Sequence, residues 1–502
     1  MSGSFHGGIH PEGNKGLVRH QAIEAMPMPK RFYVPMFQHI GEPCRPCVVV
    51  GQKVLKGEEV GRAEGRISAA THAPTSGTVV SIEEHVIGHP SYLTVPTVVI
   101  DPDGQDQWAD SVRGLVNPLS VSPSVIQEKI RAAGVVGLGG AVFPAAVKMS
   151  PPKDKPVKLL LINGSECEPY LTCDSQLMVE RAQEIVAGID IMMYTLPTNQ
   201  CVIVIEDNKP DSIRAMSQAV QPFPKMRVQA VPTRYPQGAR QNLIESITGQ
   251  EVPSGTLEAD MGILIHNVAT TFAIYEAVVL GRPLISRVVT VSGRGIVRPA
   301  NVQCLIGTPV QDVIAHCGGL NPGVRQLILG GPLMGRAIKT MEVPVVKRTS
   351  GILALLQEEI VERPEGPCIR CGRCVQVCPI RLIPCEIAWR AKSDQMDRMA
   401  EVHLMDCMEC GCCTYTCPSN IPLVHYFRHA KSVILADRLA QDKLRQDKAR
   451  IQAKEARMER EKAEKDRQKE AMKAASAARK SAAETGKGAL SEAVQQGGLP
   501  KS

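Results

Sequence analysis

The segment GLGGAVFPAAVK spans Gly137–Lys148, and an apolar run, VKLLLING, follows it at Val157–Gly164. A Rossmann fingerprint, G-x-G-x-x-G, would come directly after a strand and open a helix. Here a helix-like stretch precedes the glycines, and Phe143-Pro144 replaces the third glycine. The G-x4-GK[ST] pattern of a Walker loop is also missing. The segment therefore predicts a glycine-rich turn of another class, placed just before a buried strand of an α/β domain.

This glycine-rich turn has the features of a phosphate cradle. Gly137, Gly139 and Gly140 can adopt positive φ angles and turn backbone N–H groups toward an anion. Lys148 adds a positive charge, and Phe143 offers an aromatic face to a ring. The alternative is a turn that only packs against the sheet.

Two buried strands alternate with helical patterns after the turn. The strands are expected at Val157–Gly164 and Gln200–Asp207, and one amphipathic helix is expected at Gln176–Met193 between them. This alternation predicts an α/β domain. The loop NGSECEP, Asn163–Pro169, leaves the first strand at its carboxyl end, where open α/β sheets bind ligands.

Ten of the 17 cysteines lie between positions 368 and 417, in two blocks with the spacing C-x2-C-x2-C-x3-C-P. A [4Fe–4S] cluster needs four thiolates, and in two-cluster ferredoxins the fourth cysteine of each block ligates the other cluster. Zinc ribbons are the alternative, but they need only two C-x2-C pairs. The spacing therefore predicts two [4Fe–4S] clusters, one on Cys368, Cys371, Cys374 and Cys417 and one on Cys378, Cys407, Cys410 and Cys413.

Composition sets the broad class of this 502-residue chain. Its length and its 42 Gly and 37 Pro predict three or more turn-rich domains. No apolar run is long enough to cross a bilayer, and the first residues lack the apolar core of a signal peptide, so we expect a cytosolic body. From Lys431 onward there are 18 Lys+Arg and 11 Asp+Glu, whereas the first 430 residues carry 40 of each sign. The basic balance belongs to the tail, and no nucleic-acid partner is expected.

The glycine-rich turn and the NGSECEP loop together resemble the flavin- and NADH-binding subunit of respiratory complex I. That family reads G-x-G-G-A-x-F-P and a lysine, then N-x-x-E-x-E-P and an Asn-Val pair. The matching residues here are Gly137, Gly139, Gly140, Ala141, Phe143, Lys148, Asn163, Glu166, Glu168 and Asn267. The resemblance implies FMN on the side of Asn163, Glu166 and Asn267, with NADH near Phe143, Lys148 and Glu168. Met149 and Pro151 depart from the family, which has aromatic residues after the lysine.

The whole chain is expected to be a multidomain α/β and α+β protein. Val48–Glu84 resembles a lipoyl or biotinyl hammerhead without its modifiable lysine, and the stretch from Leu284 resembles a soluble-ligand-binding β-grasp module. The tail lacks a sustained a/d seam, which predicts a solvated helix or a disordered arm rather than a coiled coil. The predicted segments are a Gly/Pro-rich leader at 1–30, a barrel-sandwich domain at 31–101, an FMN/NADH-binding α/β domain at 115–283, the β-grasp module at 284–350, a ferredoxin-type double-cluster domain at 360–428 and the charged tail at 431–502.

Further stretches narrow the resemblance to the C subunits of the bacterial Rnf (Rsx) electron-transport complex. They are FHGGIHPEGNK (Phe5–Lys15), HAPTSGTV (His72–Val79), GGPLMGRAI (Gly330–Ile338) and the double cysteine motif. The resemblance implies a peripheral subunit of an ion-translocating NAD:ferredoxin-type oxidoreductase at the cytoplasmic face of the bacterial inner membrane. It would pass electrons between NAD(H), through FMN, and iron–sulfur partners, while integral membrane subunits move the ion. No catalytic acid or base is expected, because the flavin carries the chemistry.

Two other functions stay open at this point. One is a soluble cobalamin reductase of a bacterial microcompartment, and the other is an electron-transfer subunit that has lost nucleotide binding. Six of the other cysteines, Cys44, Cys47, Cys167, Cys173, Cys385 and Cys412, are expected to be small packed thiols. The basic tail favours anionic lipid or an acidic partner, or a solvated arm with no fixed contact.

Overall fold

The apolar run at Val157–Gly164 forms a central strand of a four-stranded parallel sheet with the order β11-β10-β9-β12. The strands are β9 (Leu159–Asn163), β10 (Cys201–Glu206), β11 (Met226–Val231) and β12 (Ile263–Asn267). Both faces of this sheet are covered, which explains why β9 and β10 read as continuous apolar runs. In the register of β9 and β12, Asn163 lies opposite Asn267 at the carboxyl ends of the two strands. The computed structural model that establishes this fold describes residues 4–152, 154–360 and 363–495.

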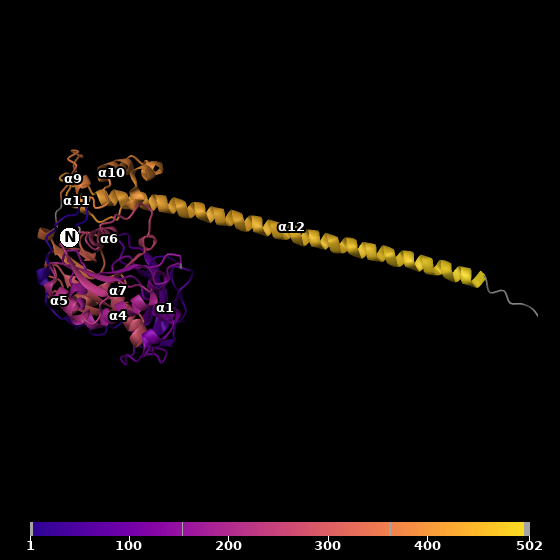
Figure 1. The fold of residues 1–502 in the computed structure, drawn as a ribbon, viewed down its shortest axis with the longest axis horizontal. Coiled ribbons are helices and arrows are strands. Elements are labelled where there is room, and N and C mark those ends of the chain that lie inside the picture. Colours follow the sequence, from indigo (N-terminus) through magenta and orange to yellow (C-terminus); the bar gives the residue numbers. More distant parts are fainter. Residues whose placement is uncertain (1–3, 153, 361–362, 496–502) are drawn as a thin grey trace, which may run out of the picture. The chain divides into compact units, whose positions relative to one another are not determined.

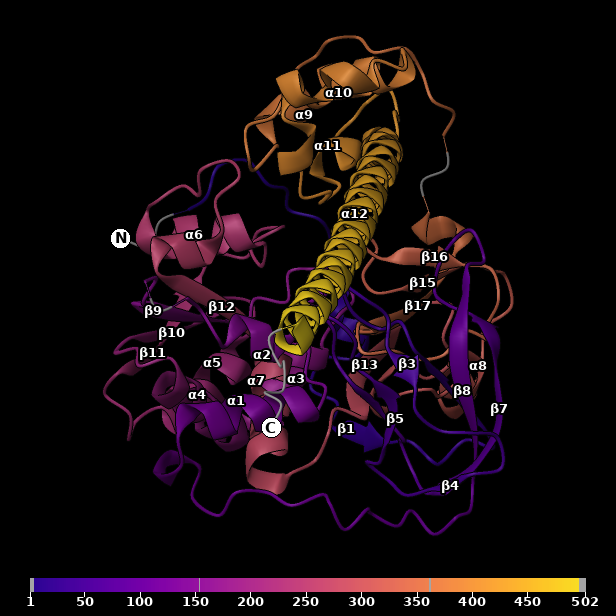
Figure 2. The same cartoon turned by 90° about the vertical axis from the view of Figure 1, so that its right-hand side faces the viewer.

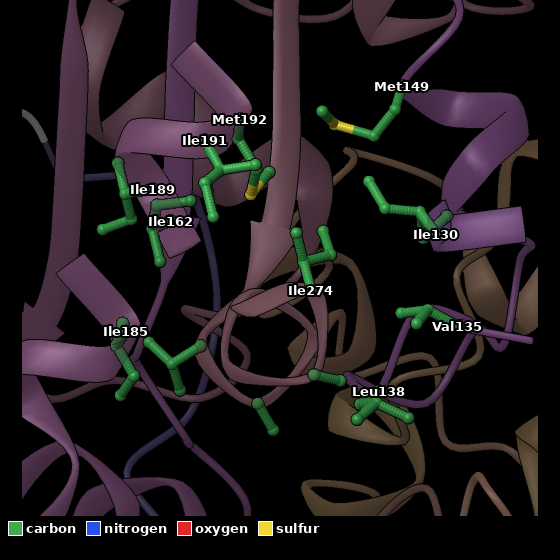
Figure 3. Close-up of a cluster of buried hydrophobic side chains, with 14 of the residues drawn as sticks. Ile130, Val135, Leu138, Met149, Ile162, Ile185, Ile189, Ile191, Met192 and Ile274 are labelled. Carbon is green, nitrogen blue, oxygen red and sulfur yellow. The ribbon is translucent and has the colours of Figure 1, made fainter. Parts of the chain in front are cut away.

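Helices cover both faces of this parallel sheet (Figure 2). They are α1 (Pro123–Ala132), α2 (Ala145–Lys148), α3 (Cys173–Glu180), α4 (Ala182–Thr195), α5 (Pro210–Ala219), α6 (Arg240–Thr248) and α7 (Val268–Tyr275). The main core lies between one face of the sheet and α1, α4 and α7, and Figure 3 shows part of it. A smaller core on the other face is closed by α6.

The single helix expected at Gln176–Met193 is wrong, because Arg181 takes a non-helical conformation and separates α3 from α4. Both helices contact α5 and α7, but their other partners differ. Helix α4 lies so close to α7 that a Cβ on Gly188 would meet the carbonyl oxygen of Thr271 at 2.4 Å, and it also contacts α1. Helix α3 also contacts β13 (Ser286–Ser292). The break lets the start of α3 reach the carboxyl end of the sheet independently of α4.

The Gly-interrupted runs near the start of the chain form two small antiparallel sheets. The strands are β2 (Phe32–Pro35), β3 (Arg45–Pro46), β4 (Lys53–Val54), β5 (Glu59–Arg62), β6 (Thr71–His72), β7 (Gly77–Val86) and β8 (Thr94–Pro102). Their orders are β2-β8-β7-β4 and β3-β5-β6. Phe32, Val34, Val79 and Ile100 are fully buried between the two sheets. This arrangement agrees with the predicted barrel sandwich.

A mixed six-stranded sheet follows the parallel sheet in the chain, with the order β1-β14-β13-β17-β15-β16. Its elements are β1 (Ile23–Ala25), β13, β14 (Ala300–Leu305), α8 (Val310–His316), β15 (Val324–Leu329), β16 (Arg336–Ile338) and β17 (Gly351–Leu356). Strand β1 comes from the leader, and β17 lies just beyond the predicted segment 284–350. The leader is therefore built into the fold.

The two cysteine blocks have the same backbone conformation. Each contains a four-residue helix, α9 (Arg373–Gln376) or α11 (Cys412–Tyr415), which begins directly after a glycine with positive φ. Gly372 and Gly411 have φ angles of 74° and 83°, and Arg370 and Glu409 have 55° and 59°. Helix α10 (Pro384–Lys392) comes between the two blocks in the sequence and lies beside α9 (Figure 1). The sequence repeat is thus a structural repeat.

Residues 1–428 and 429–502 form two separate units. The helix α12 (Leu423–Gln495) begins in the first unit and makes up the described part of the second, and every side chain from 441 to 483 is exposed. Charged pairs such as Arg457–Glu461, at 2.8 Å, recur along it and stabilise a polar helix. Of the two predicted states of the tail, the structure shows the helix. Among the described residues, none of the helices is both long and apolar enough to span a membrane.

Candidate functional site

The glycine-rich turn is closed by its own backbone and anchored in the main core. The amide of Gly137 donates to Phe143 O at 2.8 Å, and the amide of Val142 donates to Gly137 O at 3.0 Å. Leu138 is buried in the core, and its amide donates to Thr270 Oγ1 at 2.8 Å. Gly140, with a φ of 102°, is exposed, and a Cβ there would touch no other atom. The top of the turn is therefore rigidly held and open to a ligand.

Asn163, Asn267 and Gly139 come together at the carboxyl end of the parallel sheet. A Cβ on Gly139 would lie 3.2 Å from Asn267 Cβ, so the turn approaches this asparagine closely. Asn267 caps α7, because its Oδ1 accepts from Ala269 N, and its Nδ2 donates to Asp174 Oδ2 at 2.6 Å. Asn163 Nδ2 donates to Gly238 O at 3.0 Å. Three elements predicted to share one site are thus adjacent, and they form a cradle.

Glu166 fixes the edge of this cradle. It has a φ of 48°, and its carboxylate accepts from the amides of Asp174 and Ser175 at the start of α3, at 2.7 and 3.3 Å. Burial, reinforced by the Glu166 charge, raises the pKa of Asp174 to about 6. Glu166 therefore holds the start of α3 in place, and Asp174 at this start in turn contacts Asn267.

Glu168 and Lys148 make other contacts. Glu168 accepts from the amides of Leu333 and Met334 at 3.1 and 2.8 Å, and burial raises its pKa to about 7. Lys148 Nζ lies 2.8 Å from Glu258 Oε1 and donates to Ile265 O at 2.6 Å. Both side chains are committed to protein partners, whereas Ala141 at the tip of the turn is exposed and Phe143 is half-buried.

Lys15 of the leader is a site residue that sequence reasoning missed. Its Nζ donates to the carbonyl oxygens of Glu166, Glu168 and Leu171 at 2.9, 2.9 and 2.5 Å. Lys15 thereby fixes the backbone of the NGSECEP loop and of Leu171, two residues after it. The leader stretch FHGGIHPEGNK contains Lys15, but nothing local to it points to a loop about 150 residues away.

Tyr235 is a second residue that sequence reasoning missed. Its hydroxyl donates to Cys410 O at 2.7 Å, and its backbone pairs with Ile9. With Cys412 these residues form a small apolar cluster, against which Cys167 of the NGSECEP loop packs. Tyr235 lies three residues before Gly238, which contacts Asn163. One short segment therefore joins the cradle to the second cysteine block.

The predicted ligands of one cluster line a single apolar cavity. Its walls include Cys378, Cys407, Cys410 and Cys413, together with Met408 and Phe427. Within residues 4–152, 154–360 and 363–495, no three Cys, His, Asp or Glu side chains converge as a single metal ion would require. Four thiols spread around an apolar hollow fit a bulky cluster better than one zinc ion, whose ligands must meet at one point.

The other four predicted ligands are more accessible. Cys368 and Cys371 are exposed, and Cys374 and Cys417 are half-buried. Cys374 lies next to Cys385. Burial, together with the nearby Cys385 thiol, raises the pKa of Cys374 to about 11. The structural repeat gives this set the same loop conformation as the other block.

Four family models match consecutive parts of the chain. They are the RnfC Barrel sandwich hybrid domain at residues 3–105, the Nuo51 FMN-binding domain at 130–276, the SLBB domain at 288–337 and the 4Fe-4S dicluster domain at 367–421. Together with the four sheets and the cysteine repeat, these matches confirm the predicted multidomain fold class.

Several proteins named as the C subunits of ion-translocating complexes are similar to this chain. The C subunit of the ion-translocating oxidoreductase complex of Rhodobacter capsulatus is 48% identical over 86% of this chain and 83% of its own length. The C subunit of the proton-translocating ferredoxin:NAD(+) oxidoreductase complex of Clostridium ljungdahlii is 42% identical over 86% and 94%. A Pseudomonas aeruginosa relative with the same name as the first is 43% identical over 90% and 58%.

Proposed function

The chain belongs to the family of C subunits of ion-translocating oxidoreductase complexes, and we propose from this premise that it passes electrons between NAD(H) and iron–sulfur partners through a bound FMN. The observation that carries the proposal is the contact chain from the cradle to the second cysteine block. Asn163 contacts Gly238, and Tyr235, three residues earlier, donates to Cys410 O. Redox groups held at the two ends of this segment would lie next to each other.

The family matches support FMN and two [4Fe–4S] clusters as the cofactors. We assign FMN to the cradle of Gly137, Gly139, Gly140, Asn163 and Asn267, with Glu166 and Lys15 holding its edge. When bound, the flavin supplies the conversion between two-electron hydride transfer and one-electron transfer. The residues of the chain position it and exclude water from one of its faces.

The structure also suggests an order for the two clusters. The cavity lined by Cys378, Cys407, Cys410 and Cys413 belongs to the block that Tyr235 contacts. In the other set Cys368 and Cys371 are exposed. We therefore propose that the first set holds the cluster next to the flavin, and that the second set holds the outer cluster, which faces an iron–sulfur partner.

The finer assignments of partner and location follow from family membership. We propose that integral membrane subunits of the complex anchor this chain at the cytoplasmic face of a bacterial inner membrane and move the ion. Family membership favours this function over a microcompartment cobalamin reductase. A subunit without nucleotide binding remains an outcome that experiment must decide.

Analysis of cofactor content in the anaerobically purified chain tests the proposal. Two clusters and one flavin predict about eight irons, about eight sulfides and one FMN per chain. Asn267→Ala should lose FMN and keep its iron, whereas Cys410→Ser should lose about half of its iron and keep FMN. A wild-type chain with four irons or none, or one that binds no FMN, would refute the proposal.

A further inference from the structure

The lysine of the glycine-rich turn is not free to bind an anion. Lys148, which the sequence suggests for a phosphate, is held between Glu258 Oε1 and Ile265 O. A dinucleotide carries two negative phosphates, and phosphate sites in proteins are rich in Arg and Lys. Among the described residues, the cation that contacts Gly140 comes from another part of the fold.

Arg348 reaches Gly140 from the loop between β16 and β17. Its Nη2 donates to Gly140 O at 3.2 Å, and its guanidinium has no carboxylate partner among the residues that the structure describes. The preceding residue, Lys347, is fully buried, with its Nζ donating to Ala70 O and Gly134 O at 2.7 and 2.8 Å. Arg348 therefore starts from a fixed backbone position beside the open top of the turn.

Arg336 is a second unpaired arginine beside the site. It opens β16, two residues after Met334, whose amide is held by Glu168. Within the described parts of the chain its guanidinium makes no hydrogen bond and no ion pair, and the nearby Glu409 is paired with Arg428 at 3.0 Å. Desolvation by surrounding protein lowers the pKa of both Arg336 and Arg348, and the charge of Arg336 adds to the effect on Arg348. Of the described residues, Glu409 is the one carboxylate that offsets the charge of Arg336, and none offsets that of Arg348, so an anion between the two partly desolvated arginines would stabilise both.

An aromatic ring lies at the same edge of the site. Met149 is fully buried, so it cannot replace the aromatic surface missing after Lys148. Phe37, in contrast, is 42% exposed. The residues that follow it are held against both other parts of the site, because Gln38 Oε1 accepts from Lys347 N and Ile40 N donates to Val142 O. The exposed Phe37 thus belongs to a loop that contacts the residue before Arg348 and the glycine-rich turn.

We propose that Arg348 and Arg336 hold the diphosphate of a dinucleotide over Gly140 and that Phe37 stacks on its adenine. The inference rests on the proposed use of NAD(H). In this arrangement the flavin domain supplies the turn, while the six-stranded sheet supplies the charge and the barrel sandwich supplies the ring. The adenosine diphosphate half of the ligand is bound by residues outside the flavin domain.

The test is an anaerobic NADH titration of the FMN-loaded full chain, followed by flavin bleaching, with ADP-ribose as competitor. Arg348→Gln and Arg336→Gln should each weaken the apparent affinity for NADH and the inhibition by ADP-ribose about tenfold, because each removes a charged hydrogen bond to phosphate. Phe37→Ala should have a similar effect and Phe37→Tyr should restore binding, because base–aromatic stacking contributes comparably. Arg325→Gln, at an exposed position of β15 in the same sheet, should bind NADH like the wild type.

The outcomes separate this inference from the proposed function. If NADH does not bleach the wild-type flavin, the proposed function fails. If the wild type is bleached and all three variants retain its NADH affinity, only the present inference fails. Loss of FMN from the arginine variants, at unchanged iron content, would show that these side chains hold the flavin phosphate and would also overturn the inference.

Discussion

Replacement of Lys15 by Met should weaken FMN binding without loss of the clusters. The Lys15 ammonium donates to three carbonyl oxygens of the loop that carries Glu166 and Glu168, and methionine keeps only the apolar stem. A buried group left without its partner costs about 1–3 kcal/mol. Two effects reduce this cost: water can enter the vacated space, and the unfavourable burial of the Lys15 charge is removed. We therefore take the lower end of the range, about 1 kcal/mol per carbonyl.

The three carbonyls together then give about 3 kcal/mol, which is about a hundredfold in the dissociation constant of FMN. The assay is fluorescence titration of the flavin-free chain with FMN, with iron content measured on the same sample. Lys30→Met, an exposed leader lysine, is the control and should bind FMN like the wild type. Wild-type FMN affinity in Lys15→Met would refute the assigned role of the leader, since full iron content would show that the chain had folded.

Two further predictions concern the thiols and a buried acid. Cys410→Ser should remove about four irons per chain, whereas Cys412→Ala, at a buried thiol that donates to Tyr235 O, should keep all of them; equal iron loss in both variants would contradict the ligand assignment. Burial raises the pKa of Glu276 to about 7, so the native state keeps a proton that the unfolded chain releases near its ordinary pKa, and stability falls as the pH rises through this window. Glu276→Gln should therefore raise Tm relative to the wild type at pH 8 more than at pH 5, by scanning fluorimetry, and a pH-independent difference would contradict the buried position of this carboxyl.

Local patterns in the sequence were sufficient for the strands and the cysteine blocks. The run at Val157–Gly164 is apolar because its strand is covered on both faces, and the cysteine spacing is repeated within a short stretch, so both can be read without tertiary information. The break at Arg181 was not visible, because no glycine or proline marks it in the sequence. What separates α3 from α4 is tertiary: α3 also contacts β13, whereas α4 also contacts α1.

The completion of the site depends on contacts between residues far apart in the chain. Lys15 contacts Glu166 across 151 positions, Tyr235 contacts Cys410 across 175, and Arg348 contacts Gly140 across 208. No spacing rule links such residues. Lys148 illustrates the same limit. The sequence suggests that its positive charge is available to a ligand, but in the structure this charge is paired with Glu258, which lies on a distant segment of the chain.

The most direct test of electron entry is the response of the bound flavin in the anaerobic, cluster-loaded chain to NADH. The account predicts that NADH bleaches the flavin absorbance, and that Cys410→Ser, with its FMN retained, is still bleached because the nucleotide meets the flavin before the clusters. A flavin that dithionite bleaches but NADH leaves unchanged would contradict the account.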